Sequence, residues 1–226
     1  MLRVSVVMPA LNEAEGIAQT LARVRQAGEC ELIVVDGGSN DGTPEIASAY
    51  ADRVLVAPRG RAQQMNAGAQ AASGEVVLFL HADTVLPHGF PALLDHALAD
   101  PQIVGGRFDV RLEASGWTFR MIETLMNERS RLTRLSTGDQ GIFVRRELFL
   151  AVNGYPEVAL MEDLELSRTL KRTGKIACLR ARVTTSARRW QRHGVTRTIL
   201  LMWTLRSCHF LGIPPKFLKK FYADTR

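Results

Sequence analysis

The chain has 226 residues, of which 46% are hydrophobic and 23% charged, and this ordinary composition excludes disorder, collagen-like repeats and low-complexity sequence as its main organisation. The length predicts one to two domains of roughly 150 residues. The three cysteines, Cys30, Cys178 and Cys208, are far apart and odd in number. A disulfide framework or a zinc site is therefore not expected, and a reducing compartment fits best.

The net charge of +6 is unevenly distributed along the chain. Residues 1–167 carry 14 Lys/Arg against 22 Asp/Glu, whereas residues 168–226 carry 15 Lys/Arg and a single acid, Asp224. This asymmetry indicates an anionic partner for the C-terminal quarter, such as a phosphate, nucleic acid or an anionic membrane face. A solubilising basic surface is the alternative, and charge alone does not decide between the two.

Two apolar stretches are candidates for a signal peptide or a membrane-associated segment. The N-terminal run reaches Pro9 without a long apolar core or a cleavage site, so a signal peptide is not expected. The stretch Thr198–Ile213 is shorter than a membrane span of roughly 20 residues, and Arg206 and His209 interrupt it. Its basic and aromatic neighbours would suit the surface of a bilayer. A helix packed on the core with a basic outer face is the slightly preferred interpretation.

The first half alternates predicted strands and helices. Apolar, β-branched runs predict strands at 3–8, 31–35, 53–57 and 75–80. Pro9 is expected to end the first strand, and Asn12 to cap a helix with Glu15 as its reciprocal partner. Further helices are predicted from Thr43 to about residue 51 and over 62–72. Such alternation implies an α/β fold, with a mostly parallel sheet covered by helices on both faces.

The second half is less regular. An edge strand is predicted at 104–110, with Gly105-Gly106 marking a bulge or a close approach. Further along, the pattern predicts an amphipathic helix over 117–135, a turn at 138–141, a strand at 142–144 and a helix over 160–173. With no linker or repeat, the simplest organisation is one domain over 1–226. It would have a ligand-binding half at 1–115, a catalytic half at 116–190 and basic amphipathic helices at 191–226.

Polar residues follow three of the predicted strands: Asn12-Glu13, Asp36, and His81-Ala82-Asp83. Ligands of open α/β sheets bind outside the carboxyl ends of the strands, so these groups are expected to meet in one crevice. A carboxylate such as Asp83, at the end of a buried strand, needs a partner or a cation. Its alternative role is the N-cap of the helix that follows Pro87.

Other candidates each have a structural alternative. Asp36 before two glycines suits a ribose or base contact, or an Asx-turn. Arg61 at a predicted helix start suits a phosphate, or is a surface arginine. The pair Glu162-Asp163 can supply a general base, or can simply stabilise the helix dipole.

The sequence lacks the motifs that are typical of several other classes of enzyme and metal-binding protein. The chain has no G-x-G-x-x-G after its first strand, no G-x-x-x-x-G-K-[ST], no G-x-S-x-G and no His/Cys cluster with zinc spacing. Dinucleotide oxidoreductases, P-loop enzymes, hydrolases with a nucleophile elbow and zinc proteins therefore lose support.

A set of ordered motifs resembles the family 2 glycosyltransferases of GT-A fold, over about residues 3–170. The motifs are Val6–Glu13, Val34–Thr43, Asn66-x-Gly68, His81-Ala82-Asp83, Gly154-Tyr155 and Glu162-Asp163. Three further motifs resemble a bacterial subgroup of small soluble or peripheral enzymes: Gly60–Asn66, Leu80–Thr84 and Gly138–Gly141.

The resemblance implies a role for each matching position. The donor nucleotide-sugar would be bound by Pro9, Ala10, Leu11, Asn12, Glu13, Asp36, Gly37, Ser39, Arg61, Gln64, Asn66, His81, Ala82 and Asp83. The acceptor side would include Gly138, Asp139, Gln140 and Gly141. Asp83 would hold a divalent cation, Mg or Mn, as the surviving acid of a D-x-D motif whose first position is His81. Asp163, with Glu162, would supply the catalytic base.

The pair Arg189-Trp190 resembles the end of a Q-x-x-R-W motif and would bind phosphate. The Gln position is Ser186 or Ala187 here, which argues against processive polysaccharide synthesis. His193 is more readily explained as a surface histidine than as a phosphate or metal contact.

The resemblance thus implies an inverting transfer of sugar from a nucleotide-diphospho-sugar to a hydroxyl of an unidentified acceptor. The enzyme would be cytoplasmic, with no nucleic-acid partner, and with peripheral membrane contact and a homodimer left open. Two rivals remain, a sugar nucleotidyltransferase and a non-catalytic module that binds anionic membranes or nucleic acid. The base, the sugar and the acceptor are not indicated by the sequence.

Overall fold

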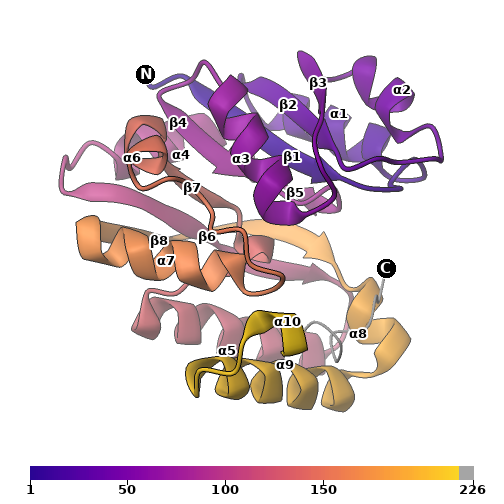
Figure 1. The fold of residues 1–226 in the computed structure, drawn as a ribbon, viewed down its shortest axis with the longest axis vertical. Coiled ribbons are helices and arrows are strands. Elements are labelled where there is room, and N and C mark those ends of the chain that lie inside the picture. The colour runs from indigo at the N-terminus through magenta and orange to yellow at the C-terminus, as the bar shows by residue number, and fades with distance from the viewer. Residues whose placement is uncertain (219–226) are drawn as a thin grey trace.

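The computed structural model describes residues 1–218, apart from the side chains of Arg189, His193 and Lys216. Eight strands form one sheet (Figure 1). They are β1 (Val4–Ala10), β2 (Glu31–Asp36), β3 (Arg53–Val56), β4 (Val76–Phe79), β5 (Thr84–Val85), β6 (Ile103–Glu113), β7 (Ile142–Arg145) and β8 (Lys175–Ser186). Their order is β3-β2-β1-β4-β7-β6-β8-β5. Strands β1 to β4 pair in parallel, as do β6 and β8, whereas β7 and β5 run antiparallel to their neighbours. The mostly parallel α/β sheet is confirmed.

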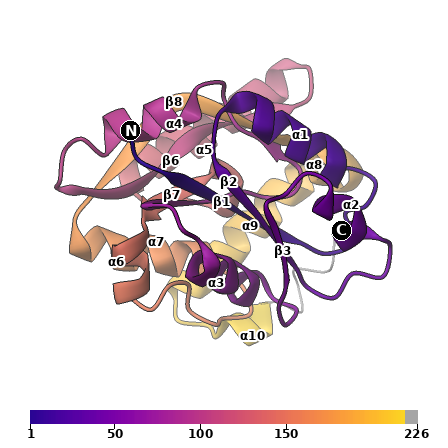
Figure 2. The same cartoon turned by 90° about the horizontal axis from the view of Figure 1, so that it is seen from above.

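Helices cover both faces of the sheet (Figure 2). They are α1 (Ile17–Ala27), α2 (Thr43–Ser48), α3 (Arg61–Ala71), α4 (Phe90–Ala97), α5 (Trp117–Thr133), α6 (Arg146–Ala151), α7 (Glu162–Thr173), α8 (Arg188–His193), α9 (Val195–Phe210) and α10 (Pro215–Leu218), with a 3-10 turn, η1, at Gly138–Gln140. Alternate side chains of one strand point to opposite faces. Accordingly, Val6 packs with α1 and α4, and its neighbour Val7 packs with α3.

Two predictions at the first strand are wrong. Pro9 lies inside β1, opposite Val35 of β2. The pairing with β4 ends at Val7, so the nitrogen of Pro9 faces a position where no strand needs a donor. Asn12 does not cap α1, because that helix begins at Ile17 after Gly16. Its side-chain oxygen instead accepts a hydrogen bond from the Asn40 backbone N–H.

The predicted edge strand at 104–110 is part of β6, an internal strand between β7 and β8. The expected close approach is confirmed at both glycines. A Cβ on Gly105 would lie 2.5 Å from the Phe143 carbonyl oxygen, and one on Gly106 would lie 2.4 Å from the Ala177 carbonyl oxygen. A register shift between Ile103 and Gly105 marks an irregularity at the same place.

Of the basic helices predicted at 191–226, the structure has α9 and α10 as far as Leu218, and residues 219–226 lie outside the described part of the chain. Strand β8 was not predicted. The Thr198–Ile213 stretch falls largely in α9, which contacts α7 through a 2.7 Å hydrogen bond between His209 Nε2 and Glu165 Oε1. The Arg168 guanidinium also lies 4.9 Å from the Phe210 ring centroid. Within residues 1–218, no helix combines the length and the apolar character that a membrane crossing requires.

Candidate functional site

A cavity of about 910 Å³ opens at the carboxyl ends of β1 and β4. Its size is within the range of roughly 300–1,000 Å³ that is typical of small-molecule sites. One wall comes from the segments after β1 and β4 and from α3, and another from η1 and the start of α7. Helices α5 and α9, which lie together along the bottom of Figure 1, form a third wall, and residues of α8, β6 and β8 complete the lining. The cavity therefore joins the predicted ligand-binding half to the C-terminal helices.

The antiparallel direction of β7 explains how two distant motifs meet. Because β7 runs against β4, the first residue of β7, Ile142, pairs with the last residue of β4, Phe79. The η1 turn before β7 thus lies beside the segment that follows β4. A Cβ on Gly138 would lie only 2.6 Å from His81 Nε2, so glycine permits this approach.

Most of the predicted site residues line the cavity: Pro9, Leu11, Asn12, Glu13, Arg61, His81, Ala82, Asp83, Gly138, Asp139, Asp163 and Trp190. Others do not line it: Ala10, Asp36, Gly37, Ser39, Gln64, Asn66, Gln140, Gly141 and Glu162. The side chain of Arg189 falls outside the described part of the structure.

The predicted residues outside the lining hold the surrounding loops. The buried Gln64 amide donates to the carbonyls of Ala10 and Val35, both at 2.8 Å. Asn66 binds both backbone groups of Tyr155, accepting from its N–H and donating to its carbonyl. Gln140 and Thr137 form a capping box around η1. These residues shape the site, and their direct contact with a donor remains a prediction.

Asp36 has the geometry of an Asx-turn, which was the structural alternative to a ribose or base contact. One carboxylate oxygen accepts hydrogen bonds from the backbone N–H groups of Gly38 at 2.8 Å and Ser39 at 2.9 Å. The Ser39 hydroxyl in turn accepts a hydrogen bond from the Asn12 N–H. Similarly, the Thr43 hydroxyl accepts one from the Glu13 N–H. The loops after β1 and β2 are therefore joined, and Asp36 fixes their shape.

Asp163 is held by two backbone donors at the start of α7. Its Oδ2 accepts from the Gly138 N–H at 2.9 Å, and its Oδ1 from the Leu164 N–H at 2.8 Å. Burial raises the pKa of Asp163, against the lowering effect of these hydrogen bonds. The charge of Asp139 raises this pKa further and that of Arg61 lowers it. A positioned carboxylate with a raised pKa suits a general base.

Asp83 lines the same cavity as Asp163. Its alternative role as an N-cap is wrong, because α4 begins at Phe90 after Gly89. The guanidinium of Arg188 lies 3.6 Å from both Asp83 Oδ2 and Glu13 Oε2. These two carboxylates thus already attract positive charge, which fits a cation site.

Among the residues described, no three His, Cys, Asp or Glu side chains cluster as a complete metal site. A hard cation at Asp83 would therefore need oxygens from its ligand, as Mg²⁺ commonly takes them from phosphates.

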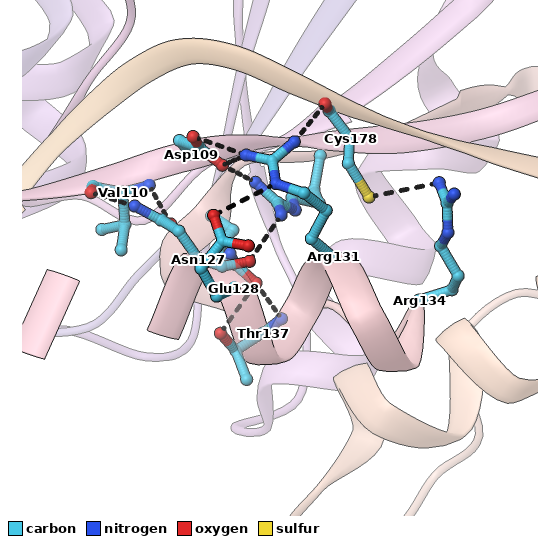
Figure 3. Close-up of polar contacts among 10 residues, drawn as sticks. Asp109, Val110, Asn127, Glu128, Arg131, Arg134, Thr137 and Cys178 are labelled. Carbon is cyan, nitrogen blue, oxygen red and sulfur yellow. Dashed lines mark hydrogen bonds and ion pairs between the residues drawn. The ribbon is translucent and has the colours of Figure 1, made fainter. Parts of the chain in front are cut away.

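Helix α5 is fixed on β6 by a buried polar network (Figure 3). Asp109 Oδ1 and Oδ2 both accept from Arg131 at 2.8 Å, and Asp109 also pairs with the fully buried Arg107. The Asn127 side chain bonds both backbone groups of Val110. This network holds the cavity-facing side of α5 at a fixed place on the sheet.

The sequence interpretation expected the predicted helix over 117–135 to shape the acceptor side, but it did not name many of the individual residues of the cavity wall. These residues are Arg59, Leu112, Ile122, Leu125, Met126, Glu128, Arg129, Leu132, Thr133, Thr137, Met161, Thr185, Ser186, Arg188, Arg192, Thr198, Ile199, Met202, Trp203 and Arg206. The basic residue that interrupts the apolar run of α9, Arg206, was one available signal. Arg188 gave none, since nothing in the sequence places it beside Asp83.

Comparison with known proteins adds independent evidence. Residues 5–150 match the model of the family described as Glycosyl transferase family 2. An undecaprenyl-phosphate 4-deoxy-4-formamido-L-arabinose transferase of Pectobacterium carotovorum (strain PC1) is 34% identical over 158 residues, which cover 63% of this chain and 47% of that protein. An uncharacterized glycosyltransferase of Mycobacterium tuberculosis (strain H37Rv) is 33% identical over 134 residues, or 57% of this chain and 59% of that protein. The chain thus spans about half the length of these relatives.

Solved structures share the fold. A mannosyltransferase from Pyrobaculum calidifontis, in complex with GDP-Man and Mn²⁺, superposes with a TM-score of 0.69 at 21% identity, covering 93% of this chain and 62% of that one. Glucosyl-3-phosphoglycerate synthase from M. tuberculosis, in complex with Mn²⁺, UDP and its product, gives a TM-score of 0.56 at 24% identity, covering 80% of this chain and 70% of that one. At these identities the likeness establishes the GT-A fold alone.

Proposed function

This chain belongs to glycosyl transferase family 2, and we propose that it transfers a sugar from a nucleotide-diphospho-sugar to an acceptor hydroxyl with inversion at the anomeric carbon. One observation carries the proposal: Asp83 and Asp163, 80 positions apart in the sequence, line the same cavity. The mannosyltransferase was solved in complex with GDP-Man and Mn²⁺ and the synthase in complex with UDP and Mn²⁺, which supports a nucleotide-sugar donor here.

The donor would lie across the segment Pro9–Glu13 and the segment His81–Asp83. Asp83 would hold a divalent cation, Mg or Mn. When bound, that cation supplies positive charge to neutralise the diphosphate leaving group. The Arg188 guanidinium, which already lies near Asp83 and Glu13, would contact diphosphate oxygens on the same side.

Asp163 would take the proton from the acceptor hydroxyl while the hydroxyl oxygen attacks the anomeric carbon. The bond from that carbon to the diphosphate breaks, and the nucleoside diphosphate leaves with the bonding electrons. The Gly138 and Leu164 N–H groups keep both oxygens of Asp163 oriented during this step. A positioned base of this kind contributes roughly 10²–10⁴-fold to the rate.

The proposal extends to the location and the partners of the enzyme. We infer a cytoplasmic protein with no nucleic-acid partner, because the acids Glu13, Asp36 and Asp83 at the strand ends would repel a polyanion from that edge of the sheet. Exposed apolar side chains on α9, among them Leu200 and Phe210, suit contact with the membrane surface or with a second copy of the chain. Neither contact is needed for the chemistry above.

The test begins with a thermal-shift panel of UDP- and GDP-sugars, with and without Mn²⁺, since a ligand raises stability by mass action. The slow hydrolysis of the best donor, in which the sugar is transferred to water, is then measured. This reaction needs the proposed base, Asp163, but no acceptor. Asp163→Asn should lower hydrolysis about 100-fold or more while donor binding persists. Glu147→Gln is the control, since that exposed acid of α6 does not line the cavity. Near-normal hydrolysis by Asp163→Asn would overturn the assignment of the base.

A further inference from the structure

Two arginines that the proposed chemistry does not use face the cavity from different helices. Arg129 belongs to α5 and Arg206 to α9, and both line the cavity. The Arg129 Nε and Nη2 atoms and the Arg206 Nε atom are buried and have no hydrogen-bond partner in the structure. A buried guanidinium nitrogen without a partner is destabilising, because it has lost its hydrogen bonds to water and makes none to the protein.

The electrostatics of the pair also indicate that the positive charge of these two arginines is not fully compensated by acidic neighbours. Burial lowers the pKa of Arg129 to about 10, and the neighbouring positive charge of Arg206 lowers it as well. Asp139 and Asp163 oppose this shift but do not cancel it. Guanidinium groups bind the oxygens of phosphate and carboxylate with well-defined geometry, so an anionic group between the two helices would satisfy the unpartnered nitrogens.

The wall beside these arginines is apolar, which a sugar or a nucleotide does not require. Leu125 and Leu132 lie two turns apart on α5, and Trp203 faces them from α9 as part of the same cavity. They are 56%, 83% and 66% exposed, respectively. Large apolar side chains gathered at the mouth of a site mark a surface for an apolar ligand or partner.

Polar contacts hold both helices that border this groove. The Asp109–Arg131 ion pair fixes α5 on the sheet, and the His209–Glu165 hydrogen bond fixes α9 on α7. Met126 of α5 and Ile199 of α9 also belong to one hydrophobic cluster at the base of the groove. Little ordering is therefore needed when a ligand enters.

We propose that Arg129 and Arg206 bind the phosphate group of an amphiphilic acceptor, whose apolar chain lies in the groove between α5 and α9. The acceptor hydroxyl would then reach Asp163, which lies in the same cavity. This inference rests on the proposed function, because it assigns the acceptor of that reaction to a class of phosphate-containing lipid. It adds two arginines and an apolar groove that the transfer chemistry alone does not require.

Binding is tested on the full chain, without donor, through the fluorescence of Trp203 and Trp190 in the cavity. The probe is a single-chain phosphatidylglycerol below its micelle concentration. Two reference compounds separate its parts: a monoacylglycerol with the same chain, which lacks the phosphate, and glycerol phosphate, which lacks the chain. The phosphatidylglycerol should bind at least tenfold more tightly than either.

Variants then assign the subsite. Arg129→Gln and Arg206→Gln should each weaken binding of the lipid at least tenfold, without lowering the thermal midpoint. Arg197→Gln, which removes an exposed charge from the same helix as Arg206, is the matched control and should bind normally. Equal binding of glycerol phosphate and the lipid would overturn the proposal, as would unchanged lipid binding by both variants.

Failure of this inference is distinguishable from failure of the proposed function. If the arginine variants weaken nucleotide-sugar binding and leave lipid binding intact, the two arginines belong to the donor and the lipid subsite is refuted, whereas sugar transfer stands. If Asp163→Asn hydrolyses the donor normally, the base assignment fails, but the lipid titration is unaffected by that result.

Discussion

The polar network beneath α5 offers a direct comparison of two acids that share one arginine. Arg131 pairs with Asp109 at 2.8 Å and with Glu128 at 3.5 Å. The Asp109 side chain is 10% exposed and also faces the fully buried Arg107, whereas the Glu128 side chain is 58% exposed. Asp109→Asn and Glu128→Gln therefore remove the same charge from the same partner at different depths.

The expected losses in the free energy of unfolding differ severalfold between the two variants. Removing one partner of a buried ion pair costs about 3–5 kcal/mol, because the remaining charge is left without compensation. Asp109→Asn leaves two guanidinium groups in that state, so we expect a loss of about 3 kcal/mol or more in the free energy of unfolding. An exposed i,i+3 pair is worth roughly 0.5 kcal/mol at most, and Glu128→Gln should lose no more than that.

Urea unfolding followed by circular dichroism measures both variants. With a slope of about 3 kcal/mol per molar urea for a chain of this size, Asp109→Asn should shift the midpoint down by about 1 M or more. Glu128→Gln should leave the midpoint within about 0.2 M of the parent chain. Equal losses in the two variants, at unchanged slope, would refute the view that burial decides the worth of these pairs.

Two further predictions concern the base and the packing of α3. Because burial raises the pKa of Asp163, the native state holds its proton more tightly than the unfolded chain, and the stabilisation from this group is lost as pH rises through its folded-state pKa. The thermal midpoint of the parent should therefore fall as pH rises through that pKa, and this dependence should be weaker in Asp163→Asn. The parent's donor hydrolysis should fall as pH drops through the same pKa, and a pH-independent rate would contradict this. Gly68→Ala should cost about 1–3 kcal/mol in chemical denaturation, since its Cβ would lie 2.3 Å from Val7 Cγ1. Gly16→Ala, whose Cβ meets nothing within 4 Å, should cost clearly less.

The features that sequence predicted well depend on local pattern. Apolar runs of β-branched residues located β1 to β4 to within two residues, and the acids after them marked the edge of the sheet where the cavity lies. Strand β8 escaped notice because Arg180 and Arg182 interrupt its apolar pattern on the exposed side. Such a strand is specified by its pairing with β6, which is a long-range contact.

The missed part of the site has a similar cause. Arg188, Arg129 and Arg206 gain their roles only when α8, α5 and α9 assemble around one cavity. Each is an ordinary arginine in its own segment. Likewise, Asp36 and Gln64 belong to the predicted site in sequence, yet their side chains are occupied by backbone groups. Spacing along the chain indicates which residues come near a ligand, but not which of them touch it.

The division of the cavity between early strands and late helices separates two kinds of recognition. In the proposed reaction, leaving-group chemistry would depend on the segments near Glu13 and Asp83, whereas α5 and α9 supply another part of the cavity wall. Substitutions on those two helices can accumulate without disturbing the register of the central strands. If the proposed division holds, a scaffold arranged in this way could be retargeted to new acceptors by changing a few helical side chains, while the residues that activate the sugar are inherited intact.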